Sequence, residues 1–212
     1  MIVTVGNPKG GVGKSTLAVQ LSLGLTARGE RVWLIDGDRQ GTSIGAITVR
    51  AEGGRTPIPA AAYPDGATLR SQVTQQRHLH DHIIIDAGGR DSTALRAALA
   101  VSDMVLIPFL PRSFDVWALN DAAAILAEAR AVNDIKAWAV LNAADPQGGD
   151  NAEAEEAIRE LDGIELLPAR ITRRKAIAHA SGAGLHIEEY KPRDAAACAE
   201  IAALTDTLFM RS

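Results

Sequence analysis

The sequence predicts an α/β fold: a doubly wound, mostly parallel sheet flanked by helices, in a single domain that spans residues 1–212. Three observations lead to this class. Short runs rich in Val and Ile alternate with longer segments of helical periodicity. Two of the short runs, residues 83–85 and 104–107, are apolar throughout, which is typical of strands buried on both faces. Hydrophobic residues form 47% of the chain and aromatic residues only 4%, so Ala, Val, Ile and Leu must build the core.

The same periodicities predict the elements in chain order. The first helix is the clearest, because Leu17, Leu21 and Leu25 share one stripe and Gly29 stands just past its end. The Gly- and Pro-rich stretch 53–64 is the least regular, and residues 41–52 receive no element. We predict strands at Ile2–Gly6, Arg31–Asp36, Thr56–Ala61, His82–Asp86, Asp103–Phe109, Ile135–Asn142 and Ile164–Leu167, and helices at Ser15–Arg28, Thr68–Gln76, Thr93–Val101, Asp115–Val132, Ala152–Leu161, Arg173–Ser181 and Ala195–Met210.

Cysteine usage and hydropathy predict the cellular compartment. A single cysteine, Cys198, excludes an intramolecular disulfide and a cysteine metal cluster within one chain. The amino terminus has no basic, apolar and cleavage-site sequence of a secretory signal. No apolar run approaches the roughly 18 residues of a membrane span. We therefore expect a soluble cytoplasmic protein. We also expect no membrane anchor, because the last predicted helix has few cations along its polar face.

The strongest local signal is the glycine-rich loop at residues 7–16, Asn-Pro-Lys-Gly-Gly-Val-Gly-Lys-Ser-Thr, between a predicted strand and a predicted helix. Its glycines let the backbone wrap phosphates so that successive N–H groups and the helix amino end face the anion. Lys14 can reach the β- and γ-phosphates, and the Ser15 hydroxyl is placed to bind Mg²⁺. The loop therefore predicts a nucleoside triphosphate site.

The loop departs from the general pattern at two positions: Pro8 replaces the first glycine, and Lys9 adds a second cation. With Lys9 the loop resembles the deviant Walker A loop of the ParA/MinD family of ATPases. In that family the early lysine contacts the nucleotide of the facing subunit, so the resemblance implies that Lys9 couples ATP binding to formation of a homodimer. The nucleotide-binding residues implied are Lys9, Gly10, Gly11, Val12, Gly13, Lys14, Ser15 and Thr16.

Carboxylates at two predicted strand ends fit phosphoryl transfer to water, which needs a metal ion and a group that positions the water. Asp36 and Asp38 end one strand, and Asp86 ends another before Ala-Gly-Gly. The resemblance implies a Mg²⁺ site of Ser15, Asp36 and Asp86. It also implies that Lys9, Lys14 and Asp38 take part in catalysis, with Asp38 placing the water. Arg39 stands where the family has proline, so the rigidity of this segment is open.

Two further residues are implied to contact the base. Asn142 ends a predicted strand and matches a family position that hydrogen-bonds adenine, and Pro168 opens a segment, Pro168–Thr172, that resembles the loop flanking the base. The residues themselves do not exclude GTP. ATP follows from the resemblance alone.

Charge is distributed unevenly along a chain whose net charge is −4. Residues 144–165 hold eight acidic residues and one basic residue, whereas residues 168–193 hold six basic and two acidic residues. Such asymmetry lets an acidic protein present one basic face to duplex phosphates. The residues that we expect to bind DNA without sequence preference are Arg170, Arg173, Arg174 and Lys175.

The resemblance extends over nearly the whole chain in motif order and is strongest with the short ParA proteins of plasmid partition, the ParF-like group. It implies a nucleoid-associated ATPase that dimerises on ATP, binds DNA and positions a cargo such as a plasmid with a small centromere-binding or adaptor protein. The alternative is an ATP-dependent metabolic ligase of the dethiobiotin synthetase type, against which Lys9 argues. A reductase component of the nitrogenase iron protein type would need more thiolates than Cys198 supplies.

Overall fold

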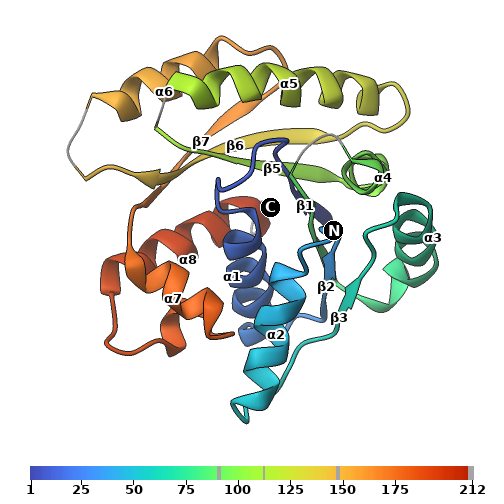
Figure 1. Ribbon diagram of the computed structural model, residues 1–212, viewed down its shortest axis with the longest axis vertical. Coiled ribbons are helices and arrows are strands. Elements are labelled where there is room, and N and C mark those ends of the chain that lie inside the picture. The colour runs from blue at the N-terminus through green and yellow to red at the C-terminus, as the bar shows by residue number, and fades with distance from the viewer. Residues whose placement is uncertain (90–91, 112, 147–148, 210–212) are drawn as a thin grey trace.

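The computed structural model describes residues 1–89, 92–111, 113–146 and 149–209, with side chains for all of these except 113–119. In this part of the chain seven strands form one sheet in the order β3-β2-β4-β1-β5-β6-β7 (Figure 1). All the strand pairs are parallel, which confirms the predicted class. The strands are β1 (Ile2–Val5), β2 (Val32–Asp36), β3 (Ala60–Ala62), β4 (His82–Asp86), β5 (Met104–Phe109), β6 (Lys136–Ala144) and β7 (Glu165–Thr172).

Helices cover both faces of the sheet, as a doubly wound fold requires (Figure 1). One apolar core lies between the sheet and α1, α2, α7 and α8, and the other face is covered by α3, α4, α5 and α6. The helices are α1 (Lys14–Ala27), α2 (Thr42–Glu52), α3 (Gly66–Gln76), α4 (Thr93–Val101), α5 (Ser113–Arg130), α6 (Asp150–Arg159), α7 (Lys175–Gly182) and α8 (Ala195–Phe209), with short 3-10 turns η1 (Arg77–Leu79) and η2 (Ile187–Glu189).

The apolar run in β4 shows why the central strands lack polar alternation. Ile84 packs into the core beneath α1, whereas Ile83 and Ile85 pack on the opposite face beneath α3 and α4. Each strand residue is thus covered by a helix on one side or the other. This burial on both faces explains why the runs that predicted the sheet are apolar throughout.

Helix α1 lies in the middle of one face and is buried nearly all round. It begins after Gly13, which has φ +95°, and ends before Gly29, which has φ +90°. Both are left-handed conformations that favour glycine. The predicted helix is confirmed to within one residue at each end, and Leu17, Leu21 and Leu25 are in the core.

The structure corrects several predicted boundaries and adds a helix. Helix α2 forms over 42–52, where no element was predicted, and β3 is shorter and later than the strand expected at 56–61. Strand β7 continues through Thr172, so Pro168 lies within a strand and not in a loop, and a register shift accompanies it. Helix α7 begins at Lys175 and not at Arg173. The predicted end of α8 at Met210 lies outside the described residues.

Helix α2 is held by contacts with the turn that follows α7. Arg50 donates to Gly184 O at 2.9 Å and forms an ion pair with Glu189 at 2.7 Å. Gly184 has φ +66°, and a Cβ on it would lie 2.4 Å from Ala46 O. Only glycine therefore permits the approach of this turn to α2.

We expect Gly184→Ala to lower the free energy of unfolding by about 3 kcal/mol or more, because backbone strain adds to overpacking. The matched control is Gly54→Ala. Gly54 has a similar φ of +72° but no atom within 4 Å of the added Cβ, so strain alone should lower stability by about 1 kcal/mol. Urea unfolding of both variants checks this, and equal losses would contradict the close approach.

Candidate nucleotide-binding site

The site forms where three neighbouring strands end at the same edge of the sheet. Asp86, at the end of β4, is the register partner of Val5 in β1 and of Asp36 in β2. The glycine-rich loop leaves β1 immediately beyond Val5 and leads into α1. Ligands of open α/β sheets bind beyond these carboxyl ends, at the point where the chain winds in opposite directions. The fold therefore places the loop and two predicted carboxylates together.

The backbone of the loop is open toward the cleft. Added Cβ atoms on Gly10 and Gly11 would meet no atom within 4 Å, and Gly11 and Gly13 have φ of +76° and +95°. Left-handed residues in such a loop turn successive N–H groups toward one concave side, which makes an anion site. The start of α1 adds its unsatisfied N–H groups to that side.

Lys14 is the buried cation of the site. Its side chain is 7% exposed, and its Nζ donates to Lys9 O at 2.8 Å. Burial lowers the pKa of Lys14, and the charges of Asp86 and Asp38 oppose this effect. The ammonium thus lies within the loop and beside two of the predicted carboxylates.

Asp36 is fully buried and anchors the segment that follows β2. Its Oδ1 accepts from the backbone N–H of Asp38, and its Oδ2 accepts from the N–H of Ile44, both at 3.0 Å. The second bond fixes the first turn of α2. Asp38 in turn accepts from the N–H of Gln40 at 3.0 Å, which stabilises the turn containing Arg39. Both carboxylates therefore order this segment, even with Arg39 in place of proline.

Asp86 differs from Asp36, because burial is poorly compensated there. It is 1% exposed, and within the described part of the chain its Oδ2 has no hydrogen-bond partner of ordinary geometry. Burial, helped by the charge of Asp36, raises the pKa of Asp86 to about 7, although Ser15, Ser43 and Lys14 act to lower it.

A divalent cation fits this donor set. The hydroxyls of Ser15 and Ser43 lie near the Asp86 carboxyl, and Ser43 Oγ is itself buried without a partner of ordinary geometry among the described residues. Mg²⁺ takes oxygen ligands and prefers one or two carboxylates with hydroxyls and phosphates. Ser43 was missed by sequence reasoning because α2 was not predicted; its place three residues after Gln40 gave no signal of its own.

An open cleft of about 1060 Å³ lies beside the loop. Gly88 and Gly89, which follow β4, line this cleft. A Cβ on Gly88 would lie 3.1 Å from Asp38 Cγ, and one on Gly89 would lie 3.5 Å from Lys14 Nζ. Asp38 is thus brought to the same cleft as Lys14. The cleft is lined by Gly10, Gly11, Gly13, Lys14, Ser15, Thr16, Gly37, Asp38, Arg39, Gln40, Thr42, Pro64, Gly88, Gly89, Ser92 and Thr93.

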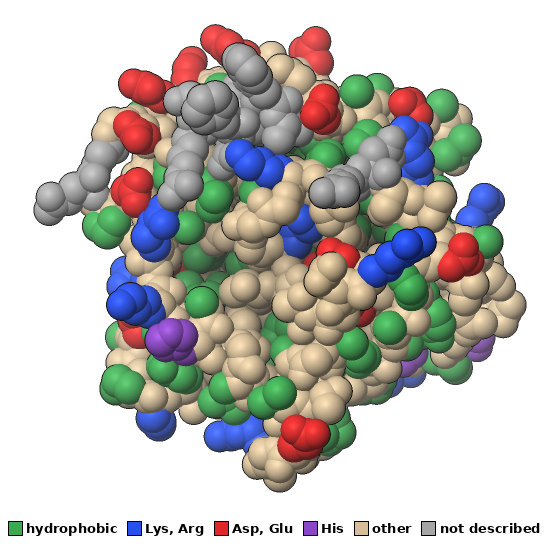
Figure 2. Space-filling view, in the orientation of Figure 1, with side chains coloured by type: hydrophobic (Ala, Val, Ile, Leu, Met, Phe, Trp, Pro, Cys, Tyr) green, Lys and Arg blue, Asp and Glu red, His purple; other side chains and the backbone are tan. Residues whose placement is uncertain are grey.

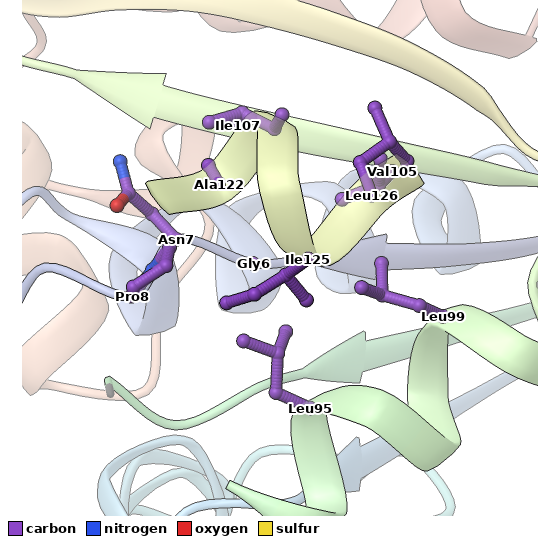
Figure 3. Close-up of a pocket in the computed structure, with 10 residues that line it drawn as sticks. All are labelled: Gly6, Asn7, Pro8, Leu95, Leu99, Val105, Ile107, Ala122, Ile125 and Leu126. Atoms are coloured by element: carbon purple, nitrogen blue, oxygen red, sulfur yellow. The ribbon is translucent and has the colours of Figure 1, made fainter. Parts of the chain in front are cut away.

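The other side of the loop rests on an apolar pocket. Figure 3 shows Asn7 and Pro8 at one end of this pocket and Leu95, Leu99 and Ile125 from α4 and α5 around it. Its volume is about 20 Å³, room for little more than one water molecule, and its walls are largely apolar. The loop therefore has a packed support on one side and the open cleft on the other.

The two residues predicted to contact the base have different surroundings. Asn142, from the end of β6, donates its side-chain amide to Val12 O at 2.7 Å, so it contacts the loop itself. Pro168 lies inside β7 and lines a different groove, with Glu155, Arg159 and Arg170. Their contact with adenine stays a prediction.

The three arginines predicted to bind DNA have acidic neighbours in the fold. Arg170 forms two hydrogen bonds with Glu155, Arg173 lies 3.3 Å from Asp145, and Arg174 pairs with Glu200 and Asp194. Lys175 is exposed at the start of α7. The predicted stretch is thus brought to the surface with much of its charge already compensated.

A glycine-rich phosphate loop, a buried lysine and strand-end carboxylates in a parallel sheet define a P-loop nucleotide-binding protein. The chain belongs to the CobQ/CobB/MinD/ParA nucleotide binding domain family, which matches residues 3–187. The resemblance to the ParA/MinD family inferred from the loop is confirmed.

Individual relatives support the same family. Maintenance of carboxysome distribution protein A of Halothiobacillus neapolitanus is 29% identical over 201 residues, 94% of this chain and 92% of that protein. Protein ParA of Rhizobium radiobacter is 31% identical over 137 residues, 64% of this chain and 60% of that protein. The fold is similar to an ATP complex of a Cyanothece McdA variant, with a TM-score of 0.77 and 15% identity over 100% of this chain and 97% of the other. Among the described helices, none has the length and apolar character to cross a membrane.

The two buried aspartates should respond oppositely to the same isosteric change. At pH 8, without nucleotide or Mg²⁺, Asp36→Asn should lower the free energy of unfolding by about 2 kcal/mol, because charged hydrogen bonds to two amides are weakened. Asp86→Asn should leave stability unchanged or raise it by about 1 kcal/mol, because a poorly compensated buried charge is removed. Urea unfolding of both variants provides the measurement, and equal losses would contradict the contrast.

Proposed function

We propose that this protein is an ATP-dependent molecular switch that hydrolyses ATP with Mg²⁺, pairs as a homodimer when ATP is bound, and positions a cargo on DNA through a small adaptor protein. The observation that carries the proposal is that one loop holds two lysines: Lys14 Nζ donates to the main-chain carbonyl of Lys9, beside Asp38 and Asp86. A single nucleotide needs one such lysine. The second suggests a use beyond holding the protomer's own phosphates.

Within one protomer the residues divide the work of phosphoryl transfer. Lys14 and the loop N–H groups would neutralise the β- and γ-phosphates, and Asp38 at the cleft would orient the attacking water. Ser15 and Asp86 would hold Mg²⁺, which supplies charge neutralisation at the transferred phosphoryl group. Asp36 supports this set from behind, because its oxygens already accept from the N–H groups of Asp38 and Ile44.

In this proposal Lys9 serves a facing protomer. Its backbone N–H is held by Asn7 Oδ1 at 2.9 Å, and its side chain is half-buried at the rim beside Gly10, which lines the cleft. A twofold mate docked over the cleft would meet Lys9 and bring its own triphosphate toward it. ATP would then join the two subunits, and hydrolysis would release them.

Variants of the two lysines separate these roles. Lys14→Ala should weaken ATP binding at least about 100-fold, because a buried cation that contacts phosphate is lost. Lys9→Ala should change ATP affinity much less and suppress ATP-dependent dimerisation, measured by light scattering with a hydrolysis-resistant ATP analogue. Retained affinity in Lys14→Ala would overturn the loop assignment. Undiminished dimerisation in Lys9→Ala would overturn the cross-subunit role.

The relatives suggest the kind of cargo. One is named for maintenance of carboxysome distribution and another is a ParA protein. The proposed cargo is therefore a plasmid, as in partition, or a protein compartment, and the adaptor is the centromere-binding protein or its counterpart on that compartment. The proposed location is the nucleoid.

Charge on the surface bears on the proposed DNA contact. Figure 2 shows acidic side chains along the upper edge of the molecule, where Figure 1 places α5 and α6. Asp150, Glu153 and Glu156 of α6, and Glu160 at its end, are exposed. DNA would be repelled there and would approach the start of α7, where Lys175 is exposed. Because Arg170, Arg173 and Arg174 are engaged by acids, their contribution to DNA binding should be smaller than their number suggests.

Co-sedimentation with DNA in the presence of ATP, ADP or no nucleotide tests the proposed switch, which requires retention with ATP alone. We expect Lys175→Glu to weaken that retention and to reduce the magnitude of its salt slope by about one. The control, Lys136→Glu, makes the same charge change at an exposed residue at the start of β6, the opposite end of the sheet, and should have no effect. Equal behaviour of the two variants would place the DNA surface elsewhere.

The ligase alternative makes a different demand, since it needs a small acid substrate before phosphate is released. Release of phosphate from ATP without any added acid separates the two. An ATPase that needed such an acid would overturn the switch.

A further inference from the structure

Two asparagines hold the phosphate loop from the sheet below it. Asn7 is 2% exposed; its Nδ2 donates to Pro108 O in β5 at 2.8 Å, and its Oδ1 accepts from Lys9 N at 2.9 Å. Asn142 reaches the other end of the loop from β6 and donates to Val12 O at 2.7 Å. Because β5 and β6 are neighbouring strands, both ends of the loop are fixed to one rigid support.

The contact at Asn142 is a close fit between a side chain and the loop backbone. A Cβ on Gly13 would lie 2.1 Å from Asn142 Nδ2, so the amide occupies the space that any other residue at position 13 would fill. Gly13 is also the residue that precedes α1, with φ +95°. The Asn142 amide therefore packs at the point where the loop turns into the helix that carries Lys14 and Ser15.

The backbone of β6 is distorted where it presents this side chain. Ala143, the next residue, has φ +49°, a left-handed conformation rare for alanine. The pairing of β6 with β7 shifts register between Asn142 and Ala144. Bulges of this kind re-aim a side chain, and strained backbone of this kind persists where the surrounding structure requires it. The distortion thus accompanies the direction in which Asn142 points.

Phosphate loops need N–H groups on the inner side and carbonyl groups turned away. We propose that Asn142 is a positioning residue that holds the Val12 carbonyl away from the phosphate cradle and so orders the loop before nucleotide binds. This role differs from a hydrogen bond to adenine, because it acts on the phosphates whatever base is attached. It deepens the proposed function and rests on it, since it concerns the same nucleotide site.

The test compares Asn142→Ala with Asn133→Ala, and includes the milder Asn142→Ser in case the first variant folds poorly. Asn133 is a matched control: it is also half-buried, and its amide also donates to backbone carbonyls, those of Leu99 and Ser102, before β6 begins. Two quantities are measured for each full-length protein. The first is amide hydrogen exchange of residues 7–16 without nucleotide, and the second is binding of ATP and of tripolyphosphate, which has no base.

We expect Asn142→Ala to speed exchange in the loop about tenfold and to weaken ATP and tripolyphosphate by the same factor, also about tenfold, which is the size of one lost hydrogen bond to a backbone group. Asn133→Ala should change neither. Unchanged loop exchange, or a loss confined to ATP, would overturn the positioning role and favour a contact with the base. If the unaltered protein bound neither ligand, the proposed function would fail, while the exchange measurement would still decide whether Asn142 orders the loop.

Discussion

Parallel pairing of β1 with β4 and of β4 with β2 sets the position of the charged groups in the site. In that register Asp86 stands beside Val5 and beside Asp36 at a common edge. A slip of one residue would turn the carboxylates to opposite faces, because side chains alternate along a strand. The loop leaves β1 at this same edge, so Lys14 enters the site by way of the helix that follows. Cation and carboxylates therefore meet because of the sheet and not because of any local sequence contact.

Burying these charges lowers stability unless each is compensated. Asp36 is compensated by two backbone N–H groups, and Lys14 by Lys9 O together with the nearby carboxylates. Asp86 is not compensated to the same extent, because among the described residues its Oδ2 has no hydrogen-bond partner of ordinary geometry, and burial raises its pKa. A site that keeps such a group is less stable than it could be, and a bound cation would remove the deficit. The uneven compensation supports the proposed division of roles, in which Asp86 holds the metal and Asp36 supports it from behind.

The loop, the core helix and most strands could be predicted from the sequence because their signals are local: glycine spacing, apolar runs and helical stripes. Helix α2 could not be, since Gly45 and its β-branched residues give low helix propensity, and it depends on the distant Gly184 and Glu189. The basic stretch was read as available charge for a similar reason. Its acidic partners are distant in sequence, with Glu155 15 residues from Arg170. Sequence patterns do not report such pairs.

Contacts between residues distant in sequence also tie the end of α7 and the segment after it to two helices of the nucleotide site, α1 and α2. Gln20, fully buried in α1, donates to Ser181 Oγ and Leu185 O and accepts from Ile187 N, so one hydrogen bond ties α1 to the end of α7 and two tie it to the segment that follows. Helix α2 is tied to the same segment by Arg50, which contacts Gly184 O and Glu189. Since α2 begins directly after the segment that Asp36 anchors, a displacement of α2 must either carry the turn after α7 with it or break the Arg50 contacts. The hydrogen bonds of Gln20 oppose movement of the turn after α7, and breaking them would be costly because Gln20 is buried. The end of α7 and the segment after it are therefore tied both to α1, which follows the phosphate loop, and to α2, which follows the Asp36 segment.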